Sequence, residues 1–323
     1  MSRVLLTGGT GLLGNHLARQ LTADGRAVRA LVRSPARGRA LLPAECEVVE
    51  GDVLDLASIR RALDGCDVVY HAAGLPEQWL RDENGFQRVN VEGTCNVVDA
   101  ALAAGVARFV YASTIDVFAW TPGAPFDESR LDPQPKGTAY ERSKQDADRL
   151  VVAALERGLP AVFVHPSAIY GPGPAGSPGL NDLLRDLLRG SVPLLLPGGM
   201  PVVFGPDVAR GHILAEQKAA PGARFILSES YWTLDELARA VHELRPSAKV
   251  PRMMPLGVAR VVAAVGEGIA GIIGKPPLIP RGQLHFLASH ARPNAERARR
   301  ELGWQPRPFL EVLPDVLSFV ERS

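Results

Sequence analysis

The sequence predicts an α/β protein with a doubly wound parallel sheet and a smaller C-terminal lobe interleaved with it. Short apolar strands alternate with longer helical stretches through the first half of the chain, and a glycine-rich loop follows the first strand. Strands separated by helices indicate right-handed βαβ crossovers, because parallel neighbours need a long connection. The chain of 323 residues is long enough for one large α/β unit with two packed lobes.

The expected strands are short runs of mostly apolar residues, at 4–6, 28–32, 47–49, 68–70, 108–111 and 161–164. Helical stretches lie between them, at residues 14–23, 56–63, 84–104 and 140–157. We expect residues 1–166 to form a dinucleotide-binding domain. Residues 167–323 should form most of a substrate-binding lobe, with some segments returning to the sheet.

Composition limits the classes of function. Hydrophobic content of 46% and charged content of 22% are typical of a soluble globular protein, and a net charge of +1 gives no general electrostatic case for nucleic acid. The cysteines Cys46, Cys66 and Cys95 are odd in number and lack metal-ligand spacing, so we expect no metal site and a reducing, cytoplasmic compartment. The first strand runs into the glycine loop without a signal-peptide pattern.

The loop after the first strand reads Thr7-Gly8-Gly9-Thr10-Gly11-Leu12-Leu13-Gly14. Its G-x-x-G-x-x-G spacing permits a tight turn, close approach of the backbone to a pyrophosphate, and tight packing of the next helix. The N-terminus of that helix offers free amides and partial positive charge to phosphates. With a strand before and a helix after, the loop indicates a Rossmann dinucleotide-binding domain. The expected cofactor contacts are Gly8, Thr10, Gly11, Leu12, Leu13 and Gly14.

Arg33 stands where the second strand ends, in Val32-Arg33-Ser34-Pro35. Rossmann domains that prefer NAD usually carry Asp or Glu there, whose carboxylate accepts the ribose hydroxyl hydrogens. A guanidinium cannot accept those hydrogens, but it matches a 2′-phosphate. We therefore expect NADP(H), with Arg33 at the 2′-phosphate and Arg37 or Arg39 as second contacts. NAD(H) is the alternative.

Two further segments fit the adenosine half of the cofactor. Asp52 and Val53 follow the third strand, so the carboxylate can accept from the adenine amino group while the valine covers the ring. Ala72 and Ala73 follow the fourth strand, and their small side chains let the cofactor approach the backbone. We interpret His71, just before them, as a structural histidine, because no second histidine is spaced as a metal co-ligand.

A series of short motifs follows these segments in a fixed order. They are T-G-G-T-G-x-x-G at 7–14, G-D-V at 51–53, H-A-A at 71–73, N-V-E-G-T at 90–94, Y-A-S-T at 111–114, D-E-S at 127–129, Y-x-x-S-K at 140–144, P-S-A-I-Y-G-P at 166–172, and E-L-G-W at 301–304 with Pro306. Over nearly its whole length the chain resembles the extended branch of the short-chain dehydrogenase/reductase superfamily. Within it, the chain looks closest to the dihydroflavonol reductase and 3β-hydroxysteroid dehydrogenase group.

Tyr140 and Lys144 lie four positions apart, so on a helix the phenol and the ammonium share one face. A cation beside a phenol lowers the phenol pKa and suits it to proton transfer near neutral pH. The resemblance implies that Tyr140 is the general acid or base, and that Lys144 assists it and holds the nicotinamide ribose. It also implies a hydroxyl that orients the substrate oxygen. That hydroxyl aligns with Thr114, where the family more often has serine.

The resemblance places further residues around the nicotinamide. Ser113 is implied to lie beside the cofactor, and Pro166 and Ser167 to flank the nicotinamide. Asn90 is implied to lie on a helix near the active site, with a mainly structural role. For Asp116 two interpretations stay open, a side chain that faces the substrate and an N-cap or loop role.

The residues at the end of the sixth strand bear on the class of reaction. Sugar-nucleotide epimerases typically carry R-x-x-N-x-Y-G-P there, whereas this chain reads H-P-S-A-I-Y-G-P at 165–172. Dehydratases usually add an acidic pair after the catalytic hydroxyl, and Ile115-Asp116 supplies one acid. We expect an NADP-dependent oxidoreductase that interconverts a ketone and a secondary alcohol on a hydrophobic small molecule. The first alternative is a nucleotide-sugar 4-epimerase or dehydratase, and the second is a non-catalytic NADP-sensing protein.

The C-terminal half is rich in aliphatic side chains, which favours an apolar substrate. Residues 256–274 are apolar apart from Arg260 and Glu267, but five glycines and two charges make a membrane span costly. We expect a buried helix that lines an apolar pocket, with association at a membrane surface as the lesser alternative. The family resemblance implies a homodimer formed through the helices at 84–104 and 140–157.

Overall fold

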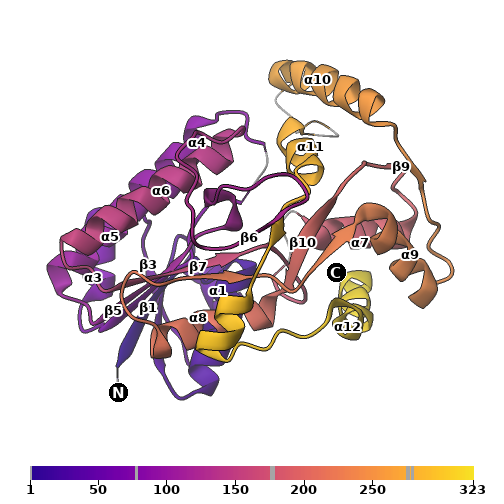
Figure 1. Ribbon diagram of the computed structural model, residues 1–323. Helices are drawn as coiled ribbons and strands as arrows, with labels where there is room; N and C mark the ends of the chain where they lie inside the picture. The colour runs from indigo at the N-terminus through magenta and orange to yellow at the C-terminus, as the bar shows by residue number, and fades with distance from the viewer. Residues whose placement is uncertain (1, 77–78, 175–178, 274–276, 278–279) are drawn as a thin grey trace.

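The computed structural model describes residues 2–76, 79–174, 179–273, 277 and 280–323. Its centre is a seven-stranded sheet in the order β11-β7-β5-β4-β1-β2-β3, and every neighbouring pair is parallel (Figure 1). The strands are β1 (Arg3–Thr7), β2 (Ala27–Val32), β3 (Glu47–Glu50), β4 (Val68–His71), β5 (Arg108–Ala112), β7 (Ala161–Pro166) and β11 (Arg224–Leu227). The predicted doubly wound α/β fold is confirmed, and each of the six predicted strands is present.

Helices cover both faces of this sheet. On one face lie α1 (Leu12–Ala23), α2 (Pro35–Leu41) and α8 (Gly205–Lys218), and on the other α3 (Leu56–Leu63), α5 (Gly93–Ala104) and α6 (Ala139–Glu156). Alternate residues of one strand serve opposite faces. Val4 and Leu6 pack into the cluster that contains α1 and α8, whereas Leu5 packs with α3 and α5. Burial on both faces explains why the strands read as continuous apolar runs.

Helix α2 is absent from the sequence prediction, which assigns no element between the strands at 28–32 and 47–49. Ser34 caps its N-terminus, where the hydroxyl accepts from the Arg37 amide at 3.4 Å, and Pro35 occupies the first turn. Gly38 faces the sheet, and a β-carbon there would lie 2.9 Å from a Val48 methyl group. Arg37 and Arg39 therefore lie on a short helix that follows Arg33.

The predicted helix at 84–104 is present but is not regular. It consists of α4 (Asn84–Phe86), a π-helical turn (Gln87–Glu92) and α5, and it ends at Gly105 with φ of 63°. A π-helical turn inserts one residue into the helix and is frequent at functional sites. The turn contains Asn90, which is buried.

A second core lies beside the sheet and is built from later segments. It unites β8 (Ala168–Tyr170), α7 (Leu180–Arg189), β10 (Gly199–Phe204), β12 (Ser230–Thr233), α9 (Leu234–Leu244) and α12 (Phe309–Arg322), with the strands in the order β12-β10-β8. The segment between β10 and β12 leaves this core, because α8 covers the central sheet and β11 pairs with β7. The chain after residue 167 thus supplies both parts of the molecule.

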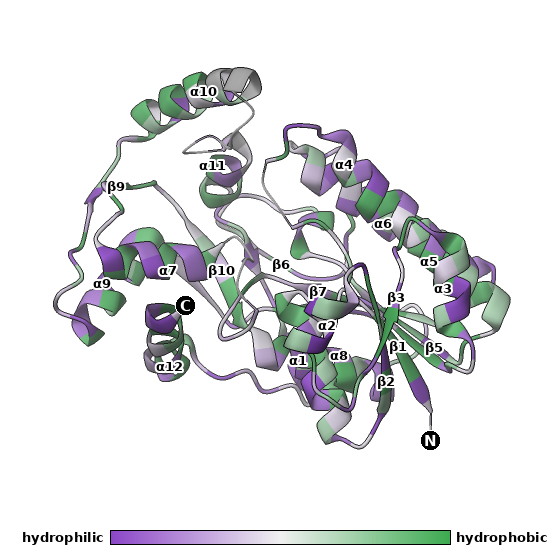
Figure 2. Cartoon of the chain, turned by 180° about the vertical axis from the view of Figure 1, so that it is seen from behind, coloured by the Kyte–Doolittle hydropathy of each residue, from purple (hydrophilic) through white to green (hydrophobic). Residues whose placement is uncertain are grey.

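The helix formed by the apolar segment at 256–274 lies at the edge of the molecule (Figures 1 and 2). This helix, α10 (Leu256–Ile273), is followed by α11 (Arg281–Ala288), and residue 274 is outside the described residues. Ala259, Ala263 and Ala270 of α10 are buried, whereas Val261 is 63% exposed. The expectation of a buried helix is therefore wrong, because Val258, Val261 and Val265 are exposed. Among the described residues, no helix has the length and apolarity needed to cross a membrane.

The closing E-L-G-W motif ties the C-terminal chain to α8. Trp304 is 1% exposed, and its indole Nε1 donates to the carbonyl oxygen of Asp207 at 2.7 Å. The Asp207 carboxylate in turn accepts from the Arg307 backbone amide at 2.8 Å and from its guanidinium at 2.7 Å. The indole therefore fills a buried site and satisfies a buried acceptor.

Replacement of Trp304 by Phe should lower the free energy of unfolding by about 2–4 kcal/mol, because it removes buried volume and leaves the Asp207 carbonyl without its donor. Urea denaturation followed by circular dichroism measures this loss. The control is Trp120→Phe, because Trp120 is half-buried, stacks on Phe126 and donates no hydrogen bond from its indole within the described part of the chain. Equal losses in the two variants would show that the Trp304 hydrogen bond is not needed.

Candidate functional site

The register of the central sheet brings the predicted site residues to one edge. Thr7 of β1 pairs with Leu31 of β2 and with His71 of β4. His71 pairs in turn with Tyr111, and Ala112 with Val164 of β7. Because all these strands are parallel, the residues that follow them lie side by side at the carboxyl edge. These residues include Gly8, Arg33, Ala72, Ala73, Ser113, Thr114 and Ser167, and Pro166 beside them is the last residue of β7.

The glycine loop is pressed against the end of β4. Gly8 has φ of 75°, and a β-carbon there would lie 2.5 Å from the Ala72 carbonyl carbon. A β-carbon at Gly14 would lie 2.2 Å from the Gly8 carbonyl oxygen, and the Gly11 amide donates to that same oxygen at 3.0 Å. Side chains at Gly8 and Gly14 would therefore force the loop away from β4 and from α1.

The loop fits a dinucleotide pyrophosphate. It lies between β1 and β4, where the strand order reverses, and Gly11 precedes α1 without a side-chain cap. The first turn of α1, which begins with Leu12 and Leu13, thus directs its amides and its positive end to this edge. Thr10 precedes it as a half-buried residue. The residues present can hold the phosphates of a nicotinamide dinucleotide.

His71 has a structural environment, as the sequence analysis expects. Its Nδ1 lies 2.7 Å from the Thr7 hydroxyl and its Nε2 lies 3.0 Å from the Thr94 hydroxyl. Burial lowers the pKa of His71 to about 3, with a smaller effect from the charge of Lys144. The imidazole is therefore neutral near pH 7. It links β1 to α5 below the glycine loop.

The predicted adenosine contacts lie at the β2 and β3 end of the edge. Arg33, Arg37 and Arg39 are exposed, and none of them takes part in an ion pair within the described ranges. Asp52 is half-buried, and its Oδ1 accepts from the Leu54 amide at 2.9 Å. Val53 lies against α5, since a β-carbon on Gly93 would be 2.8 Å from a Val53 methyl group.

Thr114 and Asp116 form a buried pair at the end of β5. Thr114 is 7% exposed, and its hydroxyl donates to Asp116 Oδ2 at 2.9 Å and accepts from the Asp116 amide at 3.3 Å. Oδ1 of Asp116 has no hydrogen-bond partner among the described residues. Burial and, to a smaller extent, the charge of Glu141 together raise the pKa of Asp116 to about 7. Thr114 thus caps the short turn at Ile115–Val117, and the Asp116 carboxylate, inside that turn, is the partner of the Thr114 hydroxyl.

Helix α6 brings Tyr140 and Lys144 to the same region. The helix begins with a capping box, in which the Thr138 hydroxyl accepts from the Glu141 amide at 3.1 Å and the Glu141 carboxylate accepts from the Thr138 amide at 2.9 Å. Tyr140 lies in the first turn, half-buried and with its ring edge-on to Phe86. Lys144 lies one turn later.

The Lys144 ammonium is buried at the end of β5. The side chain is 7% exposed, and Nζ donates to the Ala112 carbonyl oxygen at 3.1 Å. Burial lowers the pKa of Lys144 to about 8, whereas the nearby carboxylates of Asp148 and Asp116 oppose this shift. The lysine therefore carries its charge at neutral pH, and its hydrogen-bond partner, Ala112, is the last residue of β5 and lies two residues before Thr114 in the sequence.

Asn90 joins the π-helical turn to α6. Its Nδ2 donates to the Ser143 hydroxyl at 2.9 Å, and its Oδ1 accepts from the Leu75 amide at 2.8 Å. The Ser143 hydroxyl then donates to the Tyr140 carbonyl oxygen at 2.7 Å. This chain of contacts fixes the first turn of α6 and agrees with a mainly structural role for Asn90.

A buried charged network behind Thr114 is absent from the sequence prediction. The Asp148 carboxylate accepts from the Ser113 hydroxyl at 2.8 Å and pairs with Arg224 of β11 at 2.8 Å. Arg224 also lies 3.2 Å from His165 Nε2, and His165 Nδ1 lies 3.1 Å from the Thr114 carbonyl oxygen. The Ser113 side chain thus contacts Asp148 on α6. Asp148 follows Lys144 by one helical turn, so its spacing in the sequence could have indicated that it lies near the site. No local sequence pattern indicates that Arg224 lies there.

Pro166 ends β7, and Ser167 follows it with its amide bonded to the Leu227 carbonyl at 3.0 Å. The Ser167 side chain is 6% exposed, and its hydroxyl has no partner among the described residues. A buried hydroxyl without a partner is costly in a folded protein. Its place beside Thr114 at the sheet edge fits a polar contact to a bound molecule.

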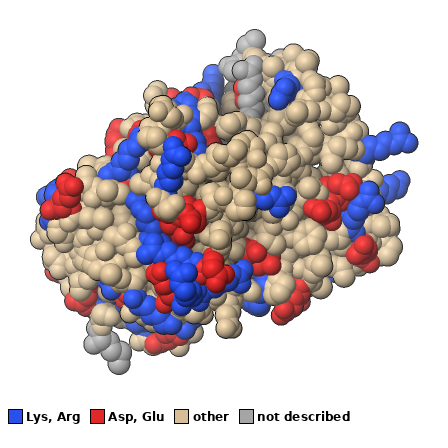
Figure 3. Space-filling model, in the orientation of Figure 1, with Lys and Arg blue, Asp and Glu red and all other residues tan. Residues whose placement is uncertain are grey.

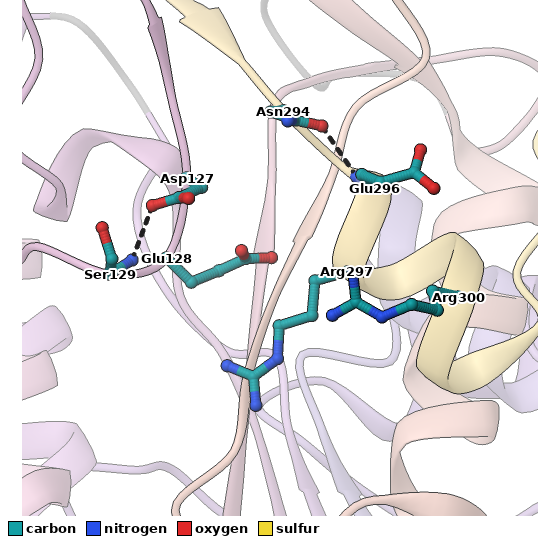
Figure 4. A pocket seen from close by; sticks show the side chains of 7 residues that line it. All are labelled: Asp127, Glu128, Ser129, Asn294, Glu296, Arg297 and Arg300. Carbon is teal, nitrogen blue, oxygen red and sulfur yellow. Dashed lines mark hydrogen bonds between the residues drawn. The ribbon is translucent and has the colours of Figure 1, made fainter.

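The D-E-S motif at 127–129 lies apart from the predicted catalytic and cofactor residues. Asp127, Glu128 and Ser129 line a surface hollow together with Asn294, Glu296, Arg297 and Arg300 (Figure 4). Glu128 Oε1 accepts from the Ile226 amide of β11 at 2.7 Å, and Arg297 pairs with Glu301. The predicted catalytic and cofactor residues do not line this hollow, so the motif stabilises the packing of β6 (Pro125–Phe126) with β11 and β14 (Arg292–Pro293).

Comparison with known proteins gives a consistent assignment. The family model for the NAD dependent epimerase/dehydratase family matches residues 4–227. A Synechocystis protein named provisionally as a dihydroflavonol 4-reductase is 29% identical over 98% of this chain and 94% of its own length. The 3 beta-hydroxysteroid dehydrogenase/Delta 5-->4-isomerase of Mycobacterium tuberculosis is 30% identical over 100% of this chain and 92% of its own.

The solved structures include one of the same architecture. The crystal structure of gox2253 superposes with a TM-score of 0.86 at 28% identity, covering 100% of this chain and 98% of that one. The structural likeness thus extends over both lobes.

Stability should depend on pH through Asp116. Its pKa is raised from 3.8 to about 7 by folding, so the folded state binds this proton more tightly, and the free energy of unfolding falls as pH rises from about 4 to about 7. The Asp116→Asn variant has no ionisable side chain at this position, so its free energy of unfolding should not fall in this way as pH rises. Relative to the parent it should gain stability between pH 5 and pH 8, by about 1–3 kcal/mol in urea denaturation.

The control is Asp64→Asn, because Asp64 is exposed and its replacement should leave the pH dependence of the parent intact. Parallel pH profiles for Asp116→Asn and the parent would contradict the raised pKa of Asp116.

Proposed function

Because the chain belongs to the NAD dependent epimerase/dehydratase family, we propose that it interconverts a ketone and a secondary alcohol on a hydrophobic small molecule, with NADP(H) as cofactor. Reductases and dehydrogenases among its relatives identify it as an oxidoreductase. The observation that carries the proposal is the buried Lys144 ammonium at the end of β5, one helical turn from Tyr140. The dinucleotide, when bound, supplies or accepts a hydride.

Tyr140 transfers the proton in this proposal. The charge of Lys144, four residues away on α6, favours the phenolate and thus lowers the free-energy cost of proton loss from the phenol. In reduction Tyr140 gives its proton to the oxygen on which negative charge develops, and in oxidation it removes the hydroxyl proton. The hydrogen bond of Lys144 to the Ala112 carbonyl holds the cation in place for both directions.

Thr114 orients the substrate oxygen, and Asp116 controls the direction of its hydrogen bond. When Asp116 is ionised, the Thr114 hydroxyl donates to it, so the threonine oxygen can only accept from a substrate hydroxyl. When Asp116 is protonated, it can donate to Thr114, and the threonine hydrogen is free for a substrate carbonyl. Ionised Asp116 therefore suits alcohol binding, and protonated Asp116 suits ketone binding.

Arg33 supports the choice of NADP(H) over NAD(H). It follows β2 at the carboxyl edge of the sheet, beside the glycine loop, and it is exposed without an ion-pair partner in the described part of the chain. A ribose 2′-phosphate would pair with a guanidinium at this position, and a ribose diol would find no acceptor there.

A hydrophobic substrate is supported by two observations. The segment after β7 lacks the arginine and asparagine that sugar-nucleotide epimerases typically use for a diphosphate. The relatives include a dehydrogenase named for a steroid and a reductase named for a dihydroflavonol, both small molecules built on fused rings. We therefore place ring-containing apolar ketones first among the candidates.

The rate of NADPH oxidation, measured with a panel of hydrophobic ketones, tests the proposed reaction. The variant Tyr140→Phe tests the proposed role of Tyr140 as the proton donor. The variant should lower kcat by about 10²- to 10⁴-fold, because the proton donor is gone, while the dissociation constant for NADPH changes little. Tyr231→Phe is the control, since Tyr231 contacts His290 and lies outside the proposed machinery. Unchanged turnover in Tyr140→Phe would exclude this tyrosine as the acid.

The same panel, extended to sugar nucleotides, separates the alternatives. A reductase exchanges NADPH freely and turns over ketones. An epimerase retains NAD until it is denatured and converts a sugar nucleotide without net oxidation of NADPH. Binding of NADPH without turnover of any compound would favour a sensor protein.

Replacement of Arg33 by Asp should lower the preference for NADPH over NADH by about 10- to 100-fold, measured as the ratio of kcat/KM values. The variant loses charged hydrogen bonds to the 2′-phosphate and gains an acceptor for the ribose diol. Arg61→Asp is a matched control, because Arg61 is an exposed arginine on α3 without an ion pair among the residues described. An unchanged ratio would overturn the cofactor assignment.

A further inference from the structure

Exposed large apolar side chains concentrate on one part of the surface. Among the described residues eight are exposed, and six of these lie on α10 or on the short paired strands β9 (Leu194–Leu195) and β13 (Arg252–Met253) beside it. The six are Leu194, Met253, Leu256, Val258, Val261 and Val265. The two others, Leu244 and Leu310, lie on α9 and α12. Scattered exposed apolar residues need no explanation, but a cluster marks an interaction surface.

The three valines form a stripe along the outer face of α10. Val258, Val261 and Val265 are spaced by three and four residues, which places them on one side of a helix, and they are 49%, 63% and 57% exposed. Ala259 and Ala263, on the opposite side, pack with Leu284 of α11. These three valines are therefore exposed while Ala259 and Ala263 are buried, and Val262 is partly buried against the alanines. Burial of apolar surface in the core would favour the reverse arrangement.

Exposed cations flank the valine stripe. Lys249, Arg252 and Arg260 are exposed, and Glu267 is the sole acidic residue between positions 246 and 273 of the sequence. None of the three cations takes part in an ion pair within the described ranges. In Figure 3 the upper part of the molecule, over α10, is largely tan with isolated blue groups. The surface is therefore apolar with a positive border.

A membrane surface fits these features better than a second copy of the chain. An 18-residue helix is about 27 Å long and about 10 Å wide, so its outer face offers about 270 Å². A standard protein interface buries about 800 Å² on each partner. A bilayer surface needs no matching partner, and helices that lie in it carry an apolar stripe beside Lys and Arg.

We propose that α10 docks on the surface of an anionic membrane, with the valine stripe among the lipid headgroups and with Arg252 and Arg260 at the lipid phosphates. Helix α11 connects this surface to the candidate active site. Leu284 of α11 packs under α10, and His285 lies 3.8 Å from the Glu141 carboxylate, next to Tyr140 in the sequence. A docked molecule would hold the first turn of α6 near the bilayer.

Sedimentation of the full chain with lipid vesicles tests the proposal. The parent should bind vesicles of equal parts phosphatidylglycerol and phosphatidylcholine, and it should bind phosphatidylcholine alone about 10-fold less. The triple variant Val258→Ser, Val261→Ser, Val265→Ser should reduce the bound fraction on both vesicles by about 10-fold or more. Arg252→Gln with Arg260→Gln should weaken binding to the anionic vesicles alone. Leu310→Ser and Arg61→Gln, exposed changes elsewhere, should bind as the parent does.

A second measurement guards against misfolding of the triple variant. A tryptophan placed by Val261→Trp should be quenched by brominated phosphatidylcholine in anionic vesicles, whereas one placed by Leu310→Trp should not. A parent that stays in the supernatant with anionic vesicles would overturn the proposal. Vesicle binding unchanged in a folded triple variant would also overturn it. A triple variant that instead converts a dimer to a monomer in light scattering would assign the stripe to self-association.

Discussion

The parallel register of the central sheet is the constraint on which the rest of the molecule depends. Six neighbouring pairs of strands run in the same direction, so each strand ends at the same edge, and the loops that follow them meet there. Every strand then needs a crossover, and the crossover helices bury both faces of the sheet. The glycine loop, Thr114 and Ser167 are far apart in sequence but adjacent at this edge.

The second feature of the site is a group of buried charged side chains, in which cations and carboxylates lie close together. Lys144 is desolvated at the end of β5, and its charge is opposed by Asp148 and Asp116. Asp148 in turn pairs with Arg224, while Asp116 keeps one carboxylate oxygen without a partner in the described part of the chain. Such groups are costly to bury, so they are held by hydrogen bonds from three elements, β5, α6 and β11. The arrangement keeps the Lys144 ammonium at the end of β5 and the Asp116 carboxyl group at the Thr114 hydroxyl.

Local patterns predicted the parts of the molecule that depend on local physics. The glycine spacing at 8, 11 and 14, the alternation of elements and the Tyr140–Lys144 spacing each reflect contacts within a few residues, and the family and fold inferred from them are confirmed. Helix α2 was not predicted because it is only seven residues long and contains Pro35 and Gly38, which suit a capped helix packed on a sheet but do not mark one in the sequence. The Asp148–Arg224 pair was not predicted because the two residues meet only through the pairing of β7 with β11. Helix α10 was expected to be buried because its composition is apolar, but apolar composition does not show how much of a helix surface neighbouring elements cover, and Val258, Val261 and Val265 are exposed.

The return of β11 to the sheet has a consequence for synthesis of the chain. Residues up to Leu227 must leave the ribosome before the seventh strand can dock, although the glycine loop and six strands have by then been available for some time. Until then the Asp148 carboxylate has no Arg224 to neutralise it, and β7 is an open edge with unpaired backbone groups. The nascent chain therefore carries an incomplete sheet through the emergence of β8, α7 and β10. During this interval it is exposed to pairing with other chains, and assistance from a chaperone would be most valuable.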